Sequence, residues 1–226
     1  MVVTLLTIND MKRYYEMVSG TVKALDGVDL EVKEGERIIL LGPSGSGKTT
    51  LLNCIAALDS PTAGTYSFEG KEVPRNAPEE MTTFRRENIG YVFQFFNLLQ
   101  DLTVLENILL IQELAGGRDE ERARELLALV GLEAEVDRFP TEISGGQQQR
   151  VAIARSLAKK PKLLLGDELT GNLDTKTSSM VMEVLVKACE AEGITTVFVT
   201  HDESLIRYAT RVIRLDSGIV ITDQDA

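Results

Sequence analysis

The fold of this chain is decided by the stretch Gly42-Pro43-Ser44-Gly45-Ser46-Gly47-Lys48-Thr49. It fills every fixed position of the phosphate-loop pattern G-x-x-x-x-G-K-[ST]. The apolar run at 37–41 before it is typical of a buried strand, and residues 50–58 continue with the apolar spacing of a helix. A strand, a glycine turn and a helix N-terminus therefore follow one another, which is the context that the pattern requires.

The residue types in this stretch suit a bound triphosphate. Glycines let successive backbone N–H groups point inward and form a concave anion site at the positive end of a helix. Lys48 adds a mobile positive charge for the β- and γ-phosphates, and Thr49 offers a hydroxyl to Mg²⁺. The predicted ATP-binding residues here are Gly42, Pro43, Ser44, Gly45, Ser46, Gly47, Lys48, Thr49 and Thr50.

Composition limits the possible partners. The chain has 226 residues and a formal net charge of −11, so its surface repels phosphate backbones and nucleic acid is not an expected partner. No apolar run is long enough to span a membrane, and the N-terminal residues show no basic segment followed by an apolar one, so any membrane role is expected to come through a partner. Cys54 and Cys189 lie far apart without C-x-x-C spacing, which predicts two core thiols in a reducing compartment.

Beyond the phosphate loop, short strands alternate with helical patterns. Strands are expected at 89–93, 162–166 and 195–199, and this alternation predicts a mainly parallel sheet whose ligands lie beyond the C-terminal strand ends. The polar residues at or just past such ends are Lys48, Gln94, Asp167, Glu168 and His201. Their shared placement predicts one polar site at this edge of the sheet.

The two remaining parts of the chain differ in pattern. Residues 2–8 and 28–32 read as short strands, with Tyr14 and Tyr15 in a turn between them. From 104 to 130 the apolar spacing is helical and Gly116-Gly117 separates two helices. We expect an α/β fold: a P-loop NTPase core with a mainly parallel sheet, a small antiparallel β subdomain and an inserted α-helical subdomain. This would be a single domain over 1–226, with the core at about 1–94 and 160–226 and the helical subdomain at about 95–159.

A second motif lies between the phosphate loop and the strand that ends in Asp-Glu. Ser144-Gly145-Gly146-Gln147 resembles the signature of the ATP-binding subunits of ABC transporters, and the similarity covers essentially the whole chain. The segments 90–98, 145–150 and 171–174 are similar to the branch that serves lipoprotein release and macrolide export, the LolD/MacB-like branch.

This resemblance implies an ATP hydrolase in which two copies bind head to tail, each ATP lying between the phosphate loop of one copy and the signature of the other. The contacts to the partner's ATP would come from Ser144, Gly145, Gly146, Gln147 and Asp174. Closure would require ATP, because only the triphosphate reaches both faces.

The resemblance also implies individual roles. Gln94 would contact ATP and the Mg²⁺ ion that Thr49 also binds, and Asp167 would hold the metal through water. Glu168 would orient or deprotonate the attacking water, and His201 would contact the γ-phosphate. By its spacing to Ala24-Leu25, Tyr15 fits the adenine-stacking position better than Tyr14.

Partners and location follow from the same resemblance. Transmembrane permease subunits would receive the conformational change, so the chain would be cytoplasmic and peripheral on the inner face of the cell membrane. A regulatory ATPase of the cell-division type, which tethers to a membrane protein without transport, remains an alternative. DNA-repair ATPases carry similar motifs around long coiled coils, and ribosome-associated factors usually carry two cassettes, so both fit this chain less well.

The chain departs from the family pattern beside its carboxylates. Most members have Ala-Asp-Glu-Pro where this chain has Gly166-Asp167-Glu168-Leu169. A proline would restrict the backbone of Glu168, and Gly166 would loosen the end of the strand. We therefore expect slower hydrolysis with nucleotide binding little changed.

Overall fold

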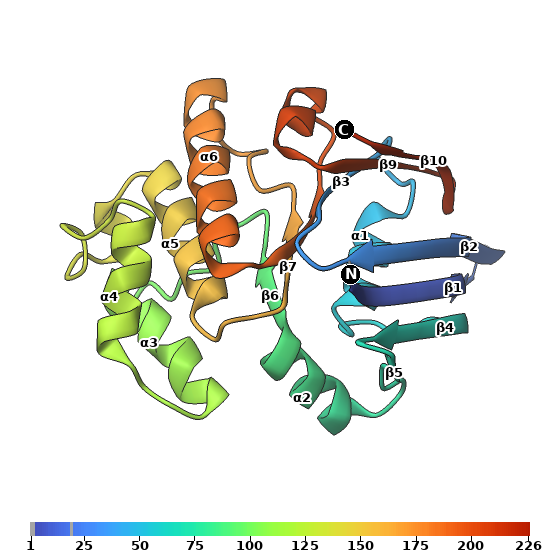
Figure 1. The fold of residues 1–226 in the computed structure, drawn as a ribbon, viewed down its shortest axis with the longest axis horizontal. Helices are drawn as coiled ribbons and strands as arrows, with labels where there is room; N and C mark the ends of the chain where they lie inside the picture. The colour runs from blue at the N-terminus through green and yellow to red at the C-terminus, as the bar shows by residue number, and fades with distance from the viewer. Residues whose placement is uncertain (1–2, 19) are drawn as a thin grey trace. The chain divides into compact units, whose positions relative to one another are not determined.

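The computed structural model describes residues 3–18 and 20–226 (Figure 1). The chain divides into two compact units, the first formed by residues 1–85 with 195–226 and the second by residues 86–194. The sequence-based division into 1–94 with 160–226 and an inserted 95–159 stays a prediction, and the two compact units group the strands at 89–92 and 163–167 with the helices.

The first unit contains an antiparallel sheet in the order β2-β1-β4-β5 (Figure 1). Its strands are β1 (Thr4–Met17), β2 (Gly20–Lys33), β4 (Ala63–Phe68) and β5 (Lys71–Glu72). The predicted antiparallel β subdomain is thereby confirmed, although its first two strands are much longer than expected.

The expected turn around Tyr14 and Tyr15 is wrong, because both residues lie within β1. The pairing of β1 with β2 shifts register several times, and Asp10 has a positive φ of 47°. Each bulge interrupts the alternation of buried and exposed side chains, so the sequence loses the period-2 pattern that marks a strand. Residue 2 of the predicted first strand and residue 19 after the predicted turn lie outside the described residues, as does residue 1.

The parallel strands of the first unit place the phosphate loop. The order is β10-β9-β3-β8, and β3 (Arg37–Leu41) is parallel to both β8 (Thr195–Val199) and β9 (Arg211–Asp216). The last strand, β10 (Ile219–Asp225), pairs antiparallel with β9. Four of the five residues of β3 are buried, as expected for a parallel strand covered on both faces. The loop after β3 leads into α1 (Lys48–Ile55).

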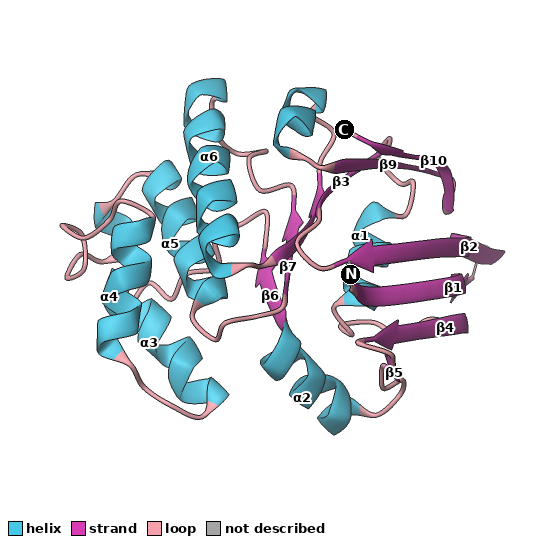
Figure 2. Ribbon diagram, viewed as in Figure 1, coloured by secondary structure: helices cyan, strands magenta, loops and turns pink. Residues whose placement is uncertain are grey.

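The second unit combines two parallel strands with helices (Figure 2). Its strands are β6 (Ile89–Val92) and β7 (Leu163–Asp167), and its helices are α3 (Val104–Ala115), α4 (Glu120–Leu129), α5 (Gly145–Leu157) and α6 (Thr175–Glu192). The predicted helical segment is confirmed: Thr103 and Glu106 form a capping box at the start of α3, and Gly116 ends it at φ 106°.

One helix has no pattern in the sequence that predicts it. Helix α2 (Pro78–Asn88) carries a single buried residue, Met81, so it lacks the apolar stripe that reveals an amphipathic helix. The ring of Phe84 packs edge-on against Phe68 and Tyr66, with centroids 5.3 and 6.3 Å apart. These contacts join α2 to the antiparallel sheet through aromatic packing that no local pattern announces.

Across residues 3–18 and 20–226, the structure contains no helix with the length and apolar character needed to cross a membrane. Both cysteines are buried, as predicted. Cys54 is 1% exposed on α1 and Cys189 is 1% exposed on α6. Burial, assisted by the nearby Asp59 carboxylate, raises the pKa of the Cys54 thiol to about 12.

This burial predicts two unreactive thiols in the folded protein. At pH 8 the Cys54 thiolate is scarce, because its pKa lies far above that pH, and neither sulfur is open to a reagent. We expect an aromatic disulfide reagent to label less than about a tenth of the thiols in native protein within minutes, and both after unfolding in guanidinium. Rapid stoichiometric labelling of the native chain would contradict the buried placement.

Candidate nucleotide-binding site

Glycine is required at both ends of the phosphate loop. Gly42 has φ 154° and Gly47 has φ 103°, both in the region that side-chain-bearing residues rarely adopt. A Cβ atom on Gly47 would overlap the carbonyl oxygen of Ala24 on β2, and one on Gly42 would overlap that of Leu215 on β9. The loop is therefore fixed by close approach to two strands as well as by its own backbone.

The polar groups of the loop fit an anion. Lys48 is only 8% exposed, and its Nζ atom donates to the carbonyl oxygens of Gly42 and Pro43 at 2.7 and 2.8 Å. The Oγ atom of Ser46 is buried and has no hydrogen-bond partner among the described residues. Leaving a buried hydroxyl unpaired costs about 1–3 kcal/mol, which a phosphate oxygen accepting from it would offset. Thr49 and Thr50 lie in the first turn of α1.

The two adjacent tyrosines of β1 make separate contacts. Tyr15 donates from its hydroxyl to Asp59, 2.7 Å away in the segment just after α1, and the Arg13 guanidinium lies 4.4 Å from its ring centre. Tyr14 instead donates to Asp26 on β2, and these contacts raise the pKa of the Tyr14 phenol. Of the two rings, Tyr15 is thus the one linked to the phosphate-loop helix.

His201 follows β8 by two residues and is exposed. Because β3 and β8 are parallel neighbours, the phosphate loop and His201 follow the same ends of adjacent strands. The next residue, Asp202, accepts a hydrogen bond from the backbone N–H of Ser204 at 2.8 Å. A side-chain hydrogen bond with Ser204, followed by this backbone bond, lowers the pKa of Asp202. The turn that carries His201 is therefore capped.

The second unit brings the other predicted polar residues together in the same way. Gln94 follows β6. Asp167 ends β7, the parallel neighbour of β6, and Glu168 is the residue after it. A Cβ atom on Gly171 would lie 3.6 Å from Nε2 of Gln94 and 3.8 Å from Cβ of Glu168, so both side chains lie against that glycine. The side chain of Asn172 also donates to the backbone oxygen of Gln94 at 3.1 Å.

Glu168 has an unusual backbone. Its φ is 48°, in the left-handed region, and its carbonyl oxygen accepts from the N–H of Gly171 at 3.1 Å. Such a conformation costs a residue other than glycine about 1–2 kcal/mol and persists only where the surroundings hold it. Strain of this kind gathers at functional sites, which fits the predicted role of the carboxylate.

Sequence reasoning missed Arg155, the residue of α5 that binds the Gln94 segment, residues 94–97. Arg155 on α5 donates to the carbonyl oxygens of Asn97 and Phe96 at 2.6 and 3.0 Å. Burial lowers the pKa of this guanidinium, which nevertheless stays charged. The available signal was a single arginine in the stretch 151–158, where every other residue except Ser156 is apolar, since a charge on such a helix face needs partners.

The signature residues begin α5. Ser144 is the N-cap, and it forms a capping box with Gln147: the backbone N–H of Ser144 donates to Oε1 of Gln147 at 2.9 Å, and its Oγ accepts from the N–H of Gln147. A Cβ atom on Gly146 would lie 2.5 Å from Cγ2 of Thr177, and one on Gly145 would lie 3.6 Å from the Phe96 ring. The glycines therefore permit close packing at this helix end.

Asp174 is the N-cap of α6. Its carboxylate accepts from the backbone N–H groups of Lys176 and Thr177, each at 3.1 Å, and from the Thr177 hydroxyl. The side-chain bond from Thr177 is the main cause of the lowered pKa of Asp174. Through Thr177, this cap lies beside Gly146, so the structure places the starts of α5 and α6 side by side.

The segment around Gly166 differs from the expectation of a loose strand end. Gly166 is buried in β7 and pairs with Val92, and Leu169 is only 4% exposed. Leu169 therefore lacks the backbone restraint of a proline but supplies a buried side chain, which the sequence pattern did not predict.

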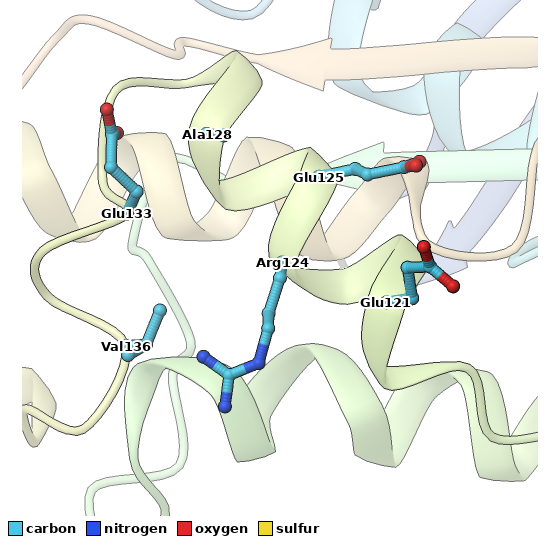
Figure 3. A pocket seen from close by; sticks show the side chains of 6 residues that line it. All are labelled: Glu121, Arg124, Glu125, Ala128, Glu133 and Val136. Carbon is cyan, nitrogen blue, oxygen red and sulfur yellow. The ribbon is translucent and has the colours of Figure 1, made fainter.

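A solvent-open hollow of about 420 Å³ lies elsewhere in the second unit, on α4 and the loop that follows it (Figure 3). It is lined by Glu121, Arg124, Glu125, Ala128, Glu133 and Val136. Three carboxylates against one guanidinium repel phosphate, so this hollow does not suit a nucleotide.

The predicted site residues are therefore distributed over both units. Tyr15, the phosphate loop and His201 belong to the first unit, and Gln94, the signature, Asp167, Glu168 and Asp174 belong to the second. Within each unit, polar residues follow the C-terminal ends of neighbouring parallel strands, the arrangement in which α/β proteins bind ligands.

Comparison with known proteins gives a consistent result. The ABC transporter family matches residues 25–171. The lipoprotein-releasing system ATP-binding protein LolD of Geobacter metallireducens is 46% identical over 97% of this chain and 99% of its own length. The macrolide export ATP-binding/permease protein MacB of Syntrophobacter fumaroxidans is 42% identical over 98% of this chain, which spans only 32% of that longer protein.

Solved structures agree. The ATP-binding cassette MJ0796, in a dimeric post-hydrolysis state bound to ADP and Pi, matches with a TM-score of 0.88 and 40% identity, covering 98% of both chains. The chain therefore belongs to the ABC transporter family, in which it is an ATP-binding subunit and an ATPase.

The close packing around Gly47 predicts that substitution there weakens ATP binding. In Gly47→Ala the new methyl group would overlap the Ala24 carbonyl and strain the backbone, so the loop would shift away from its phosphate-binding shape. We expect the Kd for ATP to rise at least about tenfold, measured by calorimetric titration.

The matched control is Gly116→Ala, because Gly116 has a similar left-handed φ, 106° against 103° for Gly47, but no atom within 4 Å of an added Cβ. It would lose some stability and keep nucleotide affinity. Equal ATP affinities for the two variants would show that the close approach to Ala24 is unimportant for binding.

Proposed function

We propose that this chain drives export, of the lipoprotein-release or macrolide-extrusion type, by binding and hydrolysing ATP beside transmembrane permease subunits. The observation that carries the proposal is that one chain holds both a phosphate loop with an unpaired buried Ser46 hydroxyl and a strained Asp167-Glu168 turn beside Gln94. The similarity to LolD along nearly the whole of both chains supports the export branch.

ATP would be held mainly by the phosphate loop. Lys48 would move from the carbonyl oxygens it now contacts to the β- and γ-phosphates, and the N-terminus of α1 would add its partial positive charge. The other predicted contacts, from Pro43 to Thr50, follow from their place in the loop and the first helical turn. The adenine would stack on Tyr15, the tyrosine joined to Asp59 after α1.

A Mg²⁺ ion would accompany the nucleotide. Its predicted protein ligands, Thr49, Gln94 and Asp167 acting through water, supply hydroxyl, amide and carboxylate oxygens, which are the hard donors that this ion prefers. Mg²⁺ would neutralise charge that develops on the phosphate oxygens. The residues of this chain supply orientation: Glu168 aligns the attacking water, and His201 contacts the γ-phosphate.

Two copies of the chain would complete the site. Ser144, Gly145, Gly146, Gln147 and Asp174 would face the ATP bound by the partner copy. The exposed Ser144 stands at the N-terminus of α5, an end that favours an anion. The dimeric state of the similar cassette MJ0796 supports this arrangement. Hydrolysis would remove the group that bridges the two faces and so release the dimer.

The partner subunits would place the chain on the cytoplasmic face of the cell membrane, with membrane contact only through them. The acidic surface argues against nucleic acid as a partner. Reconstitution with a candidate permease tests the function. ATP-dependent movement of substrate would support export, whereas binding to the permease without movement would favour the regulatory alternative.

Glu168→Gln tests the catalytic assignment. The amide keeps the size of the carboxylate but cannot take a proton from water, so we expect turnover to fall about 10²- to 10⁴-fold, with ATP affinity retained. Phosphate release measures the rate, and light scattering in ATP should show dimers that persist. The control is Glu183→Gln on an exposed face of α6, which should hydrolyse normally. Parental turnover by Glu168→Gln would exclude the proposed role.

Tyr15→Ala tests the adenine contact. Base stacking on an aromatic ring contributes about 1–3 kcal/mol, so the Kd for ATP should rise about tenfold, measured by titration. Tyr15→Phe, which loses only the hydroxyl bond to Asp59, should bind nearly as the parent does. Tyr14→Ala is the adjacent control and should leave the Kd unchanged; the reverse result would move the assignment to Tyr14.

A further inference from the structure

The residues that flank the catalytic carboxylate are in direct contact. Gly166 stands one residue before the end of β7, and Leu169 follows Glu168. A Cβ atom on Gly166 would lie 2.8 Å from each of three atoms of Leu169, namely Cγ, Cδ1 and Cδ2. Carbon atoms at van der Waals contact are about 3.5–4.0 Å apart, so the Leu169 side chain fills the space that an alanine methyl group would need.

The surroundings leave little room for adjustment. Leu169 is 4% exposed, and Gly166 is buried in the strand beside Val92. The overlap includes Cγ, the branch point of the leucine, which rotation about χ2 does not move. Relief would therefore require a change at χ1 or in the backbone of residues 168–169, and close-packed interiors resist such changes.

The same contact spans the strained residue. Glu168, with φ 48°, lies between Asp167, the last residue of β7, and the buried Leu169. Its carbonyl oxygen is held by the N–H of Gly171. A strained backbone persists where its neighbours over-determine it, and here the leucine packed on Gly166 anchors the C-terminal side of the turn.

We propose that Gly166 and Leu169 form a matched pair whose packing positions the Glu168 carboxylate. Both are positioning residues: neither needs to touch ATP, and glycine is present at 166 because leucine is present at 169. The inference rests on the proposed role of Glu168 in aligning water. It replaces the expectation of a loose turn, because the buried leucine takes over the restraint that a proline would supply.

A double-mutant cycle tests the pair. Gly166→Ala should displace Leu169 and lower kcat about tenfold, while KM and the Kd for ATP stay within about twofold of the parent. Leu169→Ala should lower kcat to a similar extent by removing the anchor. In the double variant the new methyl group meets no leucine, so kcat should be no lower than in the worse single variant.

The control for a glycine-to-alanine change is Gly117→Ala, where the new Cβ has no atom within 4 Å and φ is not positive. It should match the parent. Parental kcat in Gly166→Ala would overturn the proposal, and so would multiplication of the two single losses in the double variant. A loss of thermal stability with kcat per nucleotide-binding site unchanged would assign the contact to stability alone and would equally overturn it.

Folding itself gives a second readout. If Gly166→Ala fails to fold and the double variant folds, the clash with Leu169 is the cause and the pair is supported. If both fail to fold, Leu169 is not the cause and the proposal falls. A parental chain without ATPase activity would refute the proposed function and, with it, the positioning role, and coupled shifts of the thermal midpoint would then show a packing contact alone.

Discussion

The close approach of the phosphate loop to strands β2 and β9 is the constraint on which the rest of the site depends. Gly42 and Gly47 lie where any side chain would meet a backbone carbonyl, and the N–H of Gly218 donates to the carbonyl oxygen of Ser46. The loop is thus held by backbone atoms that cannot swing aside. Its N–H groups are oriented before a nucleotide arrives, so binding requires little reorganisation of the protein.

In both units, polar residues follow the C-terminal ends of neighbouring parallel strands. Parallel neighbours β3 and β8 present Lys48 and His201, and parallel neighbours β6 and β7 present Gln94 and Glu168. Phosphoryl transfer depends mainly on positioning and on stabilising negative charge, so placement by rigid strand ends matters more than any reactive side chain.

The sequence predicts a helix or strand correctly where the apolar residues of that element repeat regularly. The strand Thr195–Val199 was predicted with the observed bounds, because it is a run rich in β-branched residues. The bulged strand β1 and the polar helix α2 were not, because register shifts erase alternation and aromatic packing around Phe84 replaces an apolar stripe. Local periodicity predicts an element only where the element is itself periodic.

By itself, the sequence determined the phosphate loop, the carboxylates at a strand end and the family, since these depend on residue types at fixed short spacings. Only the tertiary structure decided that Tyr15 faces the segment after α1, that Arg155 holds the Gln94 segment, and that Leu169 fills the space above Gly166. Those facts depend on where side chains point across bulges, turns and strand ends, which no spacing specifies.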